Sequence, residues 1–450
     1  APERATDRQS RPFEAVDGVT VLTLHLVLLF AIPARLTFGP LGGAGSPAVM
    51  VGIVSAAIWI CYRISVNRTT AFIAQPIRRT SLLFFAVLLL SFVAACVRPI
   101  NAEELQNSQL TLLTAFGWMG ILLMACDGIP DLNRLQVYLG RLSVGAGLFA
   151  ALGLVQYLTG LPLTNFIVIP GLSANQALGG LASRDGFNRP ASTAIHPIEF
   201  GVVITALLPI CLHVAMHHRH RGAVRRWFPV IAIAVAVPIS ISRSAIVGAV
   251  VALVCVVPTW APRARALALA VLGALSVAVF VLLPGIIGTL TGLFAGASTD
   301  PSALSRTDSY ALAAQFIEQS PIFGRGIGTF LPKYRILDNQ YLLLTIEAGF
   351  LGVVLLLTVL ITALVSMSLV RRRSSDPIVR STAQACFAGI ACAAVGYALF
   401  DGFAFPTFAS VSFLLLGLAG ATWRLTAGPQ QQWLRAVATR SSGVEAASGP

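Results

Sequence analysis

Charged residues are scarce in this chain. Of its 450 residues, 11% are Asp, Glu, Lys or Arg, whereas about 25% is usual in soluble domains. Hydrophobic residues make up 56%. A soluble protein of this composition would expose far more contiguous apolar surface than the roughly 300–600 Å² that is usual. The shortage of charge therefore excludes an ordinary soluble enzyme and indicates an integral membrane protein.

Several sequence motifs are also missing. There is no Gly-x-x-x-x-Gly-Lys-Ser/Thr loop, which excludes an ATP motor of the P-loop type. The absence of Asp-x-Asp argues against a metal-dependent transferase that uses sugar nucleotides, and the absence of His-Glu-x-x-His against a zinc site of that kind. The seven cysteines are irregularly spaced and fall in or beside apolar runs, which is typical of small buried side chains. We expect no metal site and no cofactor.

Long apolar runs dominate the chain instead. A membrane-spanning helix needs about 20 mostly apolar residues, and the sequence offers about twelve such segments. They lie near residues 18–38, 47–64, 80–97, 110–127, 135–158, 197–216, 227–241, 244–260, 266–283, 340–370, 381–400 and 405–424. We therefore expect an all-α polytopic membrane protein with about 12 transmembrane helices. The pair at 227–241 and 244–260 is short, and one re-entrant unit is the alternative for it.

Acidic residues are outnumbered by basic ones, 18 against 31, which gives a formal net charge of +13. Basic chains often bind nucleic acid, but here the arginines lie between apolar segments, which favours membrane topology and phosphate-bearing lipids. No nucleic-acid partner is expected. The positive-inside rule places 22 basic residues and both termini in the cytoplasm. Nine then remain on the outer side: Arg35, Arg98, Arg184, Arg189, Arg243, Arg306, Arg325, Lys333 and Arg335.

Two segments between the apolar runs are too long to be simple turns, and loops of this size are usually functional or contain short helices. In the second loop, Ser305-Arg306-Thr307-Asp308 has the form of a capping box, which predicts a helix over 306–319, ended by Pro321. The expected organisation is a cytoplasmic tail (1–17), an N-terminal bundle of about five spans (18–158), an extracytoplasmic loop (159–196), central spans (197–283), a large extracytoplasmic loop (284–339), C-terminal spans (340–425) and a disordered cytoplasmic tail (426–450).

Two of the outer arginines are candidates for binding an anion. Arg243 is flanked by Ser242 and Ser244 between two apolar segments. A charge at that position must pair or face a wet cavity; the simpler alternative is that it extends to the membrane interface. Arg306 would begin the capped helix, where a guanidinium combines with free backbone N–H groups and the helix dipole. The alternative is a solvated loop arginine.

The densest polar signal begins at Asp338 and Asn339, just before an apolar helix, where an N-cap residue is expected. Glu347 lies about two turns inside that apolar run. An acid there must pair, stay protonated or face an aqueous cavity. Gly349 and Gly352 allow a neighbouring helix to approach closely.

Two further segments carry basic residues on the outer side. Arg189 and His196 precede the apolar run that starts at Pro197, and a histidine in that place is either functional or a helix cap. Arg325 lies in the glycine-rich sequence Gly324-Arg325-Gly326-Ile-Gly328. That segment resembles a phosphate-binding loop only weakly, and a tight turn back toward the membrane is favoured.

The order of these pieces resembles the O-antigen ligase and O-antigen polymerase superfamily. The pieces are residues 189–197, Ser242-Arg243-Ser244, Arg306 with its helix, Gly324-x-Gly326, and Asp338-Asn339-x9-Gly349-x2-Gly352. The similarity covers about residues 185–360. It implies an integral membrane transferase at the outer face of the bacterial cytoplasmic membrane. Such an enzyme moves a glycan from a polyprenyl-diphosphate carrier, of the undecaprenyl type, to a glycan or lipid acceptor without a metal or nucleotide.

The resemblance also implies roles for individual residues. Arg243 and Arg306, with Arg189, would bind the diphosphate and stabilise it as a leaving group, since guanidinium groups bind phosphate oxygens in pairs and stay charged. Asp338 is the favoured base for the acceptor hydroxyl, and His196 is the reserve. The supporting residues would be Ser242, Asn339, Glu347 and Arg325.

One departure from the family pattern bears on the reaction. In the ligase branch the motif begins with His-Asn, whereas here it begins with Asp338-Asn339, which favours an inverting polysaccharide polymerase. A ligase that hands a finished glycan to a lipid, protein or wall acceptor is the close alternative. A transporter or flippase for lipid-linked glycans is the alternative from another class, and the polymerases that act on lipid II are a more distant one.

Overall fold

The computed structural model describes residues 17–65, 75–175, 179–184, 186–282 and 301–446, without the side chains of 301–309, 427–446 and part of helix α9. The protein is 77% helical with almost no sheet. Eight of the described helices are long and apolar enough to cross a membrane, and shorter apolar helices accompany them. The predicted all-α polytopic membrane fold is confirmed.

A helix lies over each of the twelve apolar segments. The bounds are α1 Gly18–Ala31, α2 Pro47–Ser65, α3 Pro76–Val97, α4 Ala102–Gly128, α5 Leu132–Thr159, α6 Pro197–His217, α7 Ala223–Ile239, α8 Arg243–Val256, α9 Pro262–Leu282, α12 Gln340–Arg373, α13 Pro377–Leu399 and α14 Pro406–Ala446. The segments at 227–241 and 244–260 form two helices, α7 and α8.

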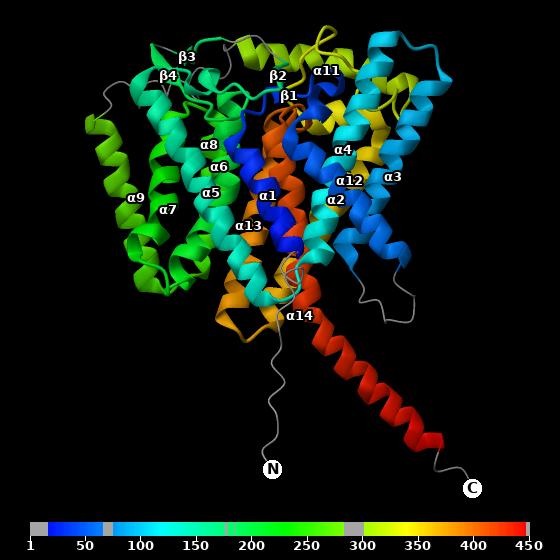
Figure 1. Ribbon diagram of the computed structural model, residues 1–450, viewed down its shortest axis with the longest axis vertical. Coiled ribbons are helices and arrows are strands. Elements are labelled where there is room, and N and C mark those ends of the chain that lie inside the picture. Colours follow the sequence, from blue (N-terminus) through cyan, green and yellow to red (C-terminus); the bar gives the residue numbers. More distant parts are fainter. Residues whose placement is uncertain (1–16, 66–74, 176–178, 185, 283–300, 447–450) are drawn as a thin grey trace.

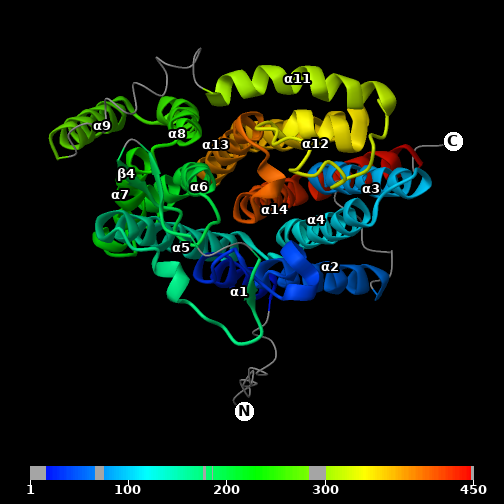
Figure 2. The same ribbon diagram turned by 90° about the horizontal axis from the view of Figure 1, so that it is seen from above.

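The helices stand side by side and alternate in direction, so that the bundle has two ends (Figure 1). We call the end that carries the strands and α11 (Pro301–Gln319) the upper face, and the end near both chain termini the lower face. On the upper face, β1 (Leu36–Thr37) pairs antiparallel with β2 (Ser173–Ala174), and β3 (Ala182–Arg184) with β4 (Phe187–Arg189). Helix α11 lies across the upper end, beside α12 (Figure 2).

Helix α6 lies at the centre of the bundle and is buried along almost its whole length. It is apolar on all sides, which is typical of a helix enclosed by others, and it packs against α5, α7, α8 and α13. Gly389 lets α13 approach α6 closely, because a Cβ at that position would lie 2.8 Å from the carbonyl oxygen of Ala206. Helix α9 lies at the edge of the bundle (Figures 1 and 2).

Helix α12 is broken at Gly349, and the large loop supplies partners to the backbone groups at the break. Gly349 has a φ of +67°, and a Cβ there would lie 2.1 Å from a carbonyl oxygen of the loop. The N–H of Phe350 donates to the carbonyl of Pro321 at 2.8 Å, and the N–H of Gly326 donates to the carbonyl of Glu347 at 2.9 Å. The glycine-rich segment is therefore packed against α12 as a tight turn.

Two local predictions are wrong. Helix α11 begins at Pro301 rather than at 306, so the Ser305–Asp308 pattern lies inside the helix and does not cap it; proline is favoured in the first turn of a helix because its missing N–H has no partner there. The chain from 426 is also not simply disordered, since α14 continues as a helix to Ala446. That stretch is rich in Ala, Gln and Arg, which have high helix propensity.

A buried acid at the start of α4 anchors the large loop. Glu104 is 3% exposed, and its carboxylate accepts hydrogen bonds from Arg325 at 2.8 Å, Tyr334 at 2.6 Å and Arg98 at 3.0 Å. The Arg325 guanidinium also lies 4.8 Å from the ring centre of Phe316 in α11. This network joins α3, α4, α11 and the loop that leads to α12.

Glu104→Ala should lower the free energy of unfolding by about 3 kcal/mol, because it leaves two partly buried guanidinium groups without their carboxylate. Unfolding titrations in mixed micelles measure the change. Glu103→Ala is the matched control: this neighbouring acid pairs with Lys333 but is 64% exposed, so its loss should cost less than about 1 kcal/mol. Equal losses for the two variants would contradict the anchoring role.

Candidate functional site

Four helices begin on the upper face: α6, α8, α12 and α14. Helix α6 packs against α8 and α14, and α12 packs against α14. Each helix start carries backbone N–H groups without partners in the helix and a partial positive charge, so their convergence favours anions. Around these starts lie five ionisable residues that we call the upper cluster: Arg189, His196, Arg243, Asp338 and Asp401.

A buried carboxylate joins the starts of α6 and α14. Glu199 is 0% exposed. Its oxygens accept hydrogen bonds from the N–H groups of Ile195 at 2.9 Å, Thr407 at 2.7 Å and Phe408 at 3.2 Å. These bonds fix two helix starts relative to each other. The sequence analysis missed this residue, although an acid three residues into an apolar run was a visible signal.

His196 caps helix α6. Its Nδ1 accepts a hydrogen bond from the N–H of Ile198 at 3.1 Å, so in the neutral ring the proton is on Nε2. Burial and the charge of Arg189 lower the pKa of His196, while Asp338 acts in the opposite direction. At neutral pH the imidazole is therefore uncharged, and Nε2 is a hydrogen-bond donor rather than an acceptor.

The segment between Arg189 and His196 is fixed to two other helices. The Ser192 N–H donates to the Gln156 side chain of α5 at 2.7 Å, and the Thr193 hydroxyl donates to the carbonyl of Phe30 in α1 at 3.0 Å. Both hydroxyl-bearing side chains are buried. The backbone that carries the two cluster residues is thus rigidly placed.

Arg189 reaches from β4 to the turn between α7 and α8. Its Nε donates to the carbonyl of Ser240 at 3.3 Å, and burial and the nearby Arg184 lower its pKa. In that turn, Ile241 is fully buried and has a φ of +45°, which is rare for a β-branched residue and costs energy. The strained turn places Ser242 and Arg243 at the start of α8.

Ser242 has the position of an N-cap but makes no capping hydrogen bond. Its hydroxyl oxygen is buried and, within the described residues, has no hydrogen-bond partner. An unpaired buried hydroxyl costs about 1–3 kcal/mol. An anionic group bound beside Arg243 and Arg189 would satisfy this hydroxyl.

Asp338 and Asn339 have different roles. The Asn339 side chain accepts the N–H of Leu342 at 3.1 Å and is the N-cap of α12, as the sequence pattern predicts for one of the two. The next residue, Gln340, accepts the N–H of Phe403 at 2.7 Å, which brings this segment beside the connection between α13 and α14. Asp338 is close enough to His196 and Asp401 to shift the pKa of each.

Asp401 is the member of the cluster that the sequence analysis missed. It lies between α13 and the short helix Gly402–Ala404. Burial, together with Asp338, raises its pKa from 3.8 to about 7. The signal in the sequence was an acid in the short connection between the last two apolar runs, which no local pattern relates to Asp338.

Two of the predicted candidates, Arg325 and Glu347, contact other parts of the protein. Arg325 pairs with Glu104. Glu347 is buried, and its carboxylate accepts the N–H of Phe330 at 3.3 Å; both residues therefore hold the large loop against α4 and α12. Arg306 belongs to α11, but its side chain is outside the described residues.

Residues 228–357 match the family model described as O-antigen ligase. The matched part includes Ser242, Arg243 and Asp338 of the candidate site, whereas Arg189, His196 and Asp401 lie outside it. A search of the curated proteins found no match. The family match supports the O-antigen ligase and polymerase superfamily, whose members are membrane glycosyltransferases, and the resemblance seen in the sequence is confirmed.

Asp401→Asn should make the protein less sensitive to pH. Because the pKa of Asp401 is raised, its contribution to the free energy of unfolding of the wild type is fully present below about pH 4. That contribution is lost as the pH rises through about 7. The variant cannot ionise, so its melting temperature should exceed that of the wild type at pH 8 but not at pH 4. Thermal unfolding in detergent at both pH values measures this difference.

Asp338→Asn provides the comparison for that experiment. Because Asp338 raises the pKa of Asp401, its removal should reduce the pH dependence without abolishing it. If Asp401→Asn shifted the melting temperature equally at both pH values, the carboxyl would be ionised throughout in the folded protein and the burial argument would be wrong.

Proposed function

We propose that this protein is a membrane glycosyltransferase that takes an oligosaccharide from a polyprenyl-diphosphate carrier and transfers it to a glycan acceptor, acting as a polysaccharide polymerase. The observation that carries the proposal is the O-antigen ligase match at 228–357. It covers Arg243 and Asp338, two residues that lie beside Arg189 and His196 around converging helix starts.

The proposed donor site uses positive charge supplied in two forms. Arg189 and Arg243, with Arg306 as a further candidate, offer guanidinium groups that bind phosphate oxygens in pairs. The four helix starts add the positive ends of their dipoles. The Ser242 hydroxyl, buried and without a partner among the described residues, would donate to the same diphosphate.

The proposed reaction is a single displacement with inversion. The acceptor hydroxyl oxygen forms a bond to the anomeric carbon of the donor sugar while the bond from that carbon to the diphosphate oxygen breaks. The electron pair leaves with the polyprenyl diphosphate, and the hydroxyl proton goes to a base. The arginines stabilise the charge that grows on the leaving group, so the scheme needs neither a metal nor a nucleotide.

Asp338 is the proposed base, because the geometry leaves His196 without a free lone pair. The Nδ1 of His196 is occupied by the N–H of Ile198, and Nε2 carries the proton of the neutral ring. His196 would then donate a hydrogen bond within the cluster. Asp401, protonated below about pH 7, would donate one to a sugar hydroxyl.

The proposed orientation places the upper cluster outside the bacterial cytoplasmic membrane and both termini in the cytoplasm. Arginines concentrate at the helix ends of the lower face, among them Arg371, Arg372 and Arg373 at the end of α12. The positive-inside rule assigns that face to the cytoplasm. The donor would be reached at the outer face.

A ligase is the second candidate, and the description of the matching family model favours it. A ligase would transfer a finished glycan to a lipid, protein or wall acceptor with the same displacement chemistry. Asp338 in place of the histidine of the ligase motif favours the polymerase. A flippase would bind the same diphosphate without breaking a bond.

The proposed function is tested by measuring the size distribution of lipid-linked glycans. The measurement compares cells that lack the protein with the same cells expressing a variant. Arg243→Ala and Asp338→Asn should behave like the deletion, with polymer synthesis reduced at least about 100-fold, since each removes a group acting in the transition state. Arg373→Ala and Asp376→Asn, which lie at the lower ends of α12 and α13, are the controls and should support normal synthesis.

The products distinguish the candidates. Single repeats that accumulate on the carrier in deletion cells indicate a polymerase, whereas long chains stranded on the carrier indicate a ligase. Intact donor confined to one membrane face, with no release of free polyprenyl diphosphate by the purified protein, indicates a flippase. Full activity of both Arg243→Ala and Asp338→Asn would refute the proposed site.

His196→Asn tests which residue is the base. Asparagine caps helices well, so the start of α6 should keep its structure, and transfer should retain roughly a tenth or more of wild-type activity because a donor near Asp338 is lost but the base is not. Transfer assays with the purified variant measure this. An activity as low as that of Asp338→Asn would instead identify His196 as the base.

A further inference from the structure

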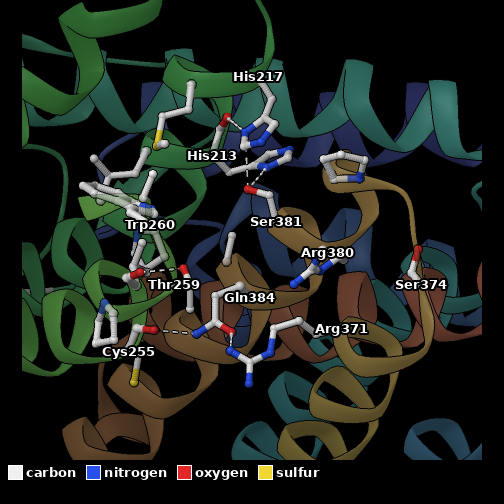
Figure 3. Close-up of a pocket in the computed structure, with 18 of the residues that line it drawn as sticks. His213, His217, Cys255, Thr259, Trp260, Arg371, Ser374, Arg380, Ser381 and Gln384 are labelled. Carbon is white, nitrogen blue, oxygen red and sulfur yellow. Dashed lines mark hydrogen bonds between the residues drawn. The ribbon is translucent and has the colours of Figure 1, made fainter. Parts of the chain in front are cut away.

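A second polar site lies on the lower face, at the opposite end of the bundle from the upper cluster. A cavity of about 790 Å³ opens between the ends of α6, α8 and α12 and the start of α13. Figure 3 shows Arg371 and Arg380 on one side of it and Cys255, Thr259 and Trp260 on the other, with His213 and His217 between them. Neither the family match nor the proposed reaction gives this cavity a role.

The charge that lines the cavity is of one sign. Arg371, Arg372 and Arg380 contribute guanidinium groups, and no Asp or Glu is among the described residues that line it. Arg371 donates to the neutral Gln384 side chain at 2.7 Å, which in turn donates to the Cys255 carbonyl at 2.6 Å. In the described part of the chain, Arg372 and Arg380 form no ion pair. The cavity therefore holds an uncompensated positive charge.

One acidic residue lies near these arginines in the sequence, but its carboxylate caps a helix. Asp376 is exposed and caps α13 by accepting the N–H of Ile378 at 2.8 Å. The negative end of the α12 dipole offsets only about half an elementary charge. Neither group neutralises three arginines.

The polar floor of the cavity is held in place by hydrogen bonds. His213 is 3% exposed; its Nδ1 lies 2.8 Å from the Ser381 hydroxyl and its Nε2 lies 2.9 Å from the Gln136 side-chain oxygen. His217 stacks on it at 5.1 Å between ring centres. The arginines thus face a polar surface whose side chains are held in place by hydrogen bonds.

The remaining wall is apolar. It includes Leu212, Met216, Val256, Trp260 and Ala385. A small soluble anion would leave this wall in contact with water, whereas an amphiphile would cover it with hydrocarbon while its phosphate meets the arginines. The cavity lies where membrane-spanning helices end, the depth at which tryptophan and arginine meet lipid headgroups.

We propose that this cavity binds the phosphate-bearing headgroup of an anionic phospholipid. Arg371, Arg372 and Arg380 would bind the phosphate oxygens, the His213–His217 pair and Ser381 would face the polar headgroup, and Leu212, Met216 and Trp260 would contact the first part of the acyl chains. The site is independent of the proposed transferase function. It is built from α6, α12 and α13, helices that also reach the upper cluster.

Tryptophan quenching tests the proposal directly, because Trp260 lines the cavity. The full chain is reconstituted in phosphatidylcholine vesicles that contain an equal mole fraction of either acyl-brominated phosphatidylglycerol or acyl-brominated phosphatidylcholine. The chain has six tryptophans, so the quenching of Trp260 is the difference between wild type and Trp260→Phe. The anionic lipid should quench Trp260 at a much lower mole fraction than the neutral lipid.

Two adjacent arginines provide a matched pair of variants. Both are exposed, but Arg372 lines the cavity and Arg373 does not. Arg372→Gln should weaken the preference for the anionic lipid about fivefold, the effect of one basic residue near a membrane surface, and Arg373→Gln should not change it. Arg371→Gln combined with Arg380→Gln should weaken it further. Since Arg372 is exposed and forms no ion pair within the described residues, its loss reports on binding.

Three outcomes would overturn the proposal. Equal quenching by the two lipids would mean that the cavity does not select anionic headgroups. An equal effect of Arg372→Gln and Arg373→Gln would mean a general attraction of the basic face. If inorganic phosphate raised the melting temperature of the wild type but not of Arg372→Gln, and phosphatidylglycerol did neither, the site would be one for a soluble anion. Failure of the transferase tests would leave all three readouts unaffected.

Discussion

Backbone hydrogen bonding inside the bilayer is the constraint on which the rest of this structure depends. Within hydrocarbon, each N–H and C=O must find its partner in the protein, so the helix interiors have little capacity left to bind anything. Binding capacity is concentrated at helix ends. On the upper face, four such ends converge, and two are joined through the Glu199 carboxylate, which accepts three backbone N–H groups.

The same constraint separates five acids of the upper half of the protein into two groups. Glu104, Glu199 and Glu347 are each no more than 5% exposed and accept hydrogen bonds from backbone N–H groups or cationic side chains. Asp338 and Asp401 are only partly buried and lie in connections, where Asp338 influences the pKa values of Asp401 and His196. The first group fixes the positions of helices, and the second is the group to which we assign chemistry in the proposed function.

Much of the fold could be predicted because long apolar runs are a strong signal. Each of the twelve predicted segments has a helix over it. The residues at which helices begin were harder to predict. The Ser305–Asp308 pattern satisfies the local rule for a cap, yet α11 starts at Pro301, five residues before the predicted start at 306. Asp338 and Asn339 were equal candidates for the cap of α12, and only the folded chain shows that Asn339 accepts the bond.

The candidate site was predicted only where its members are close in sequence to a recognisable motif. Arg243 and Asp338 fall in such motifs, but Asp401 joins the cluster through a fold that returns 63 residues later. Arg325 and Glu347 were drawn into the predicted site by the same motifs. Their actual partners are far away in the sequence, since Glu104 precedes Arg325 by 221 residues, and no local pattern records such a pair.

The break in α12 has a consequence for how the protein is made. A helix interrupted at Gly349 cannot satisfy its own backbone there, and the missing partners come from residues 321–326 of the preceding loop. That loop must therefore be fully synthesised and folded back against the bundle before α12 is a complete membrane helix. The upper part of α12 should accordingly be stable in lipid only once residues 321–326 have packed against it and supplied these backbone partners.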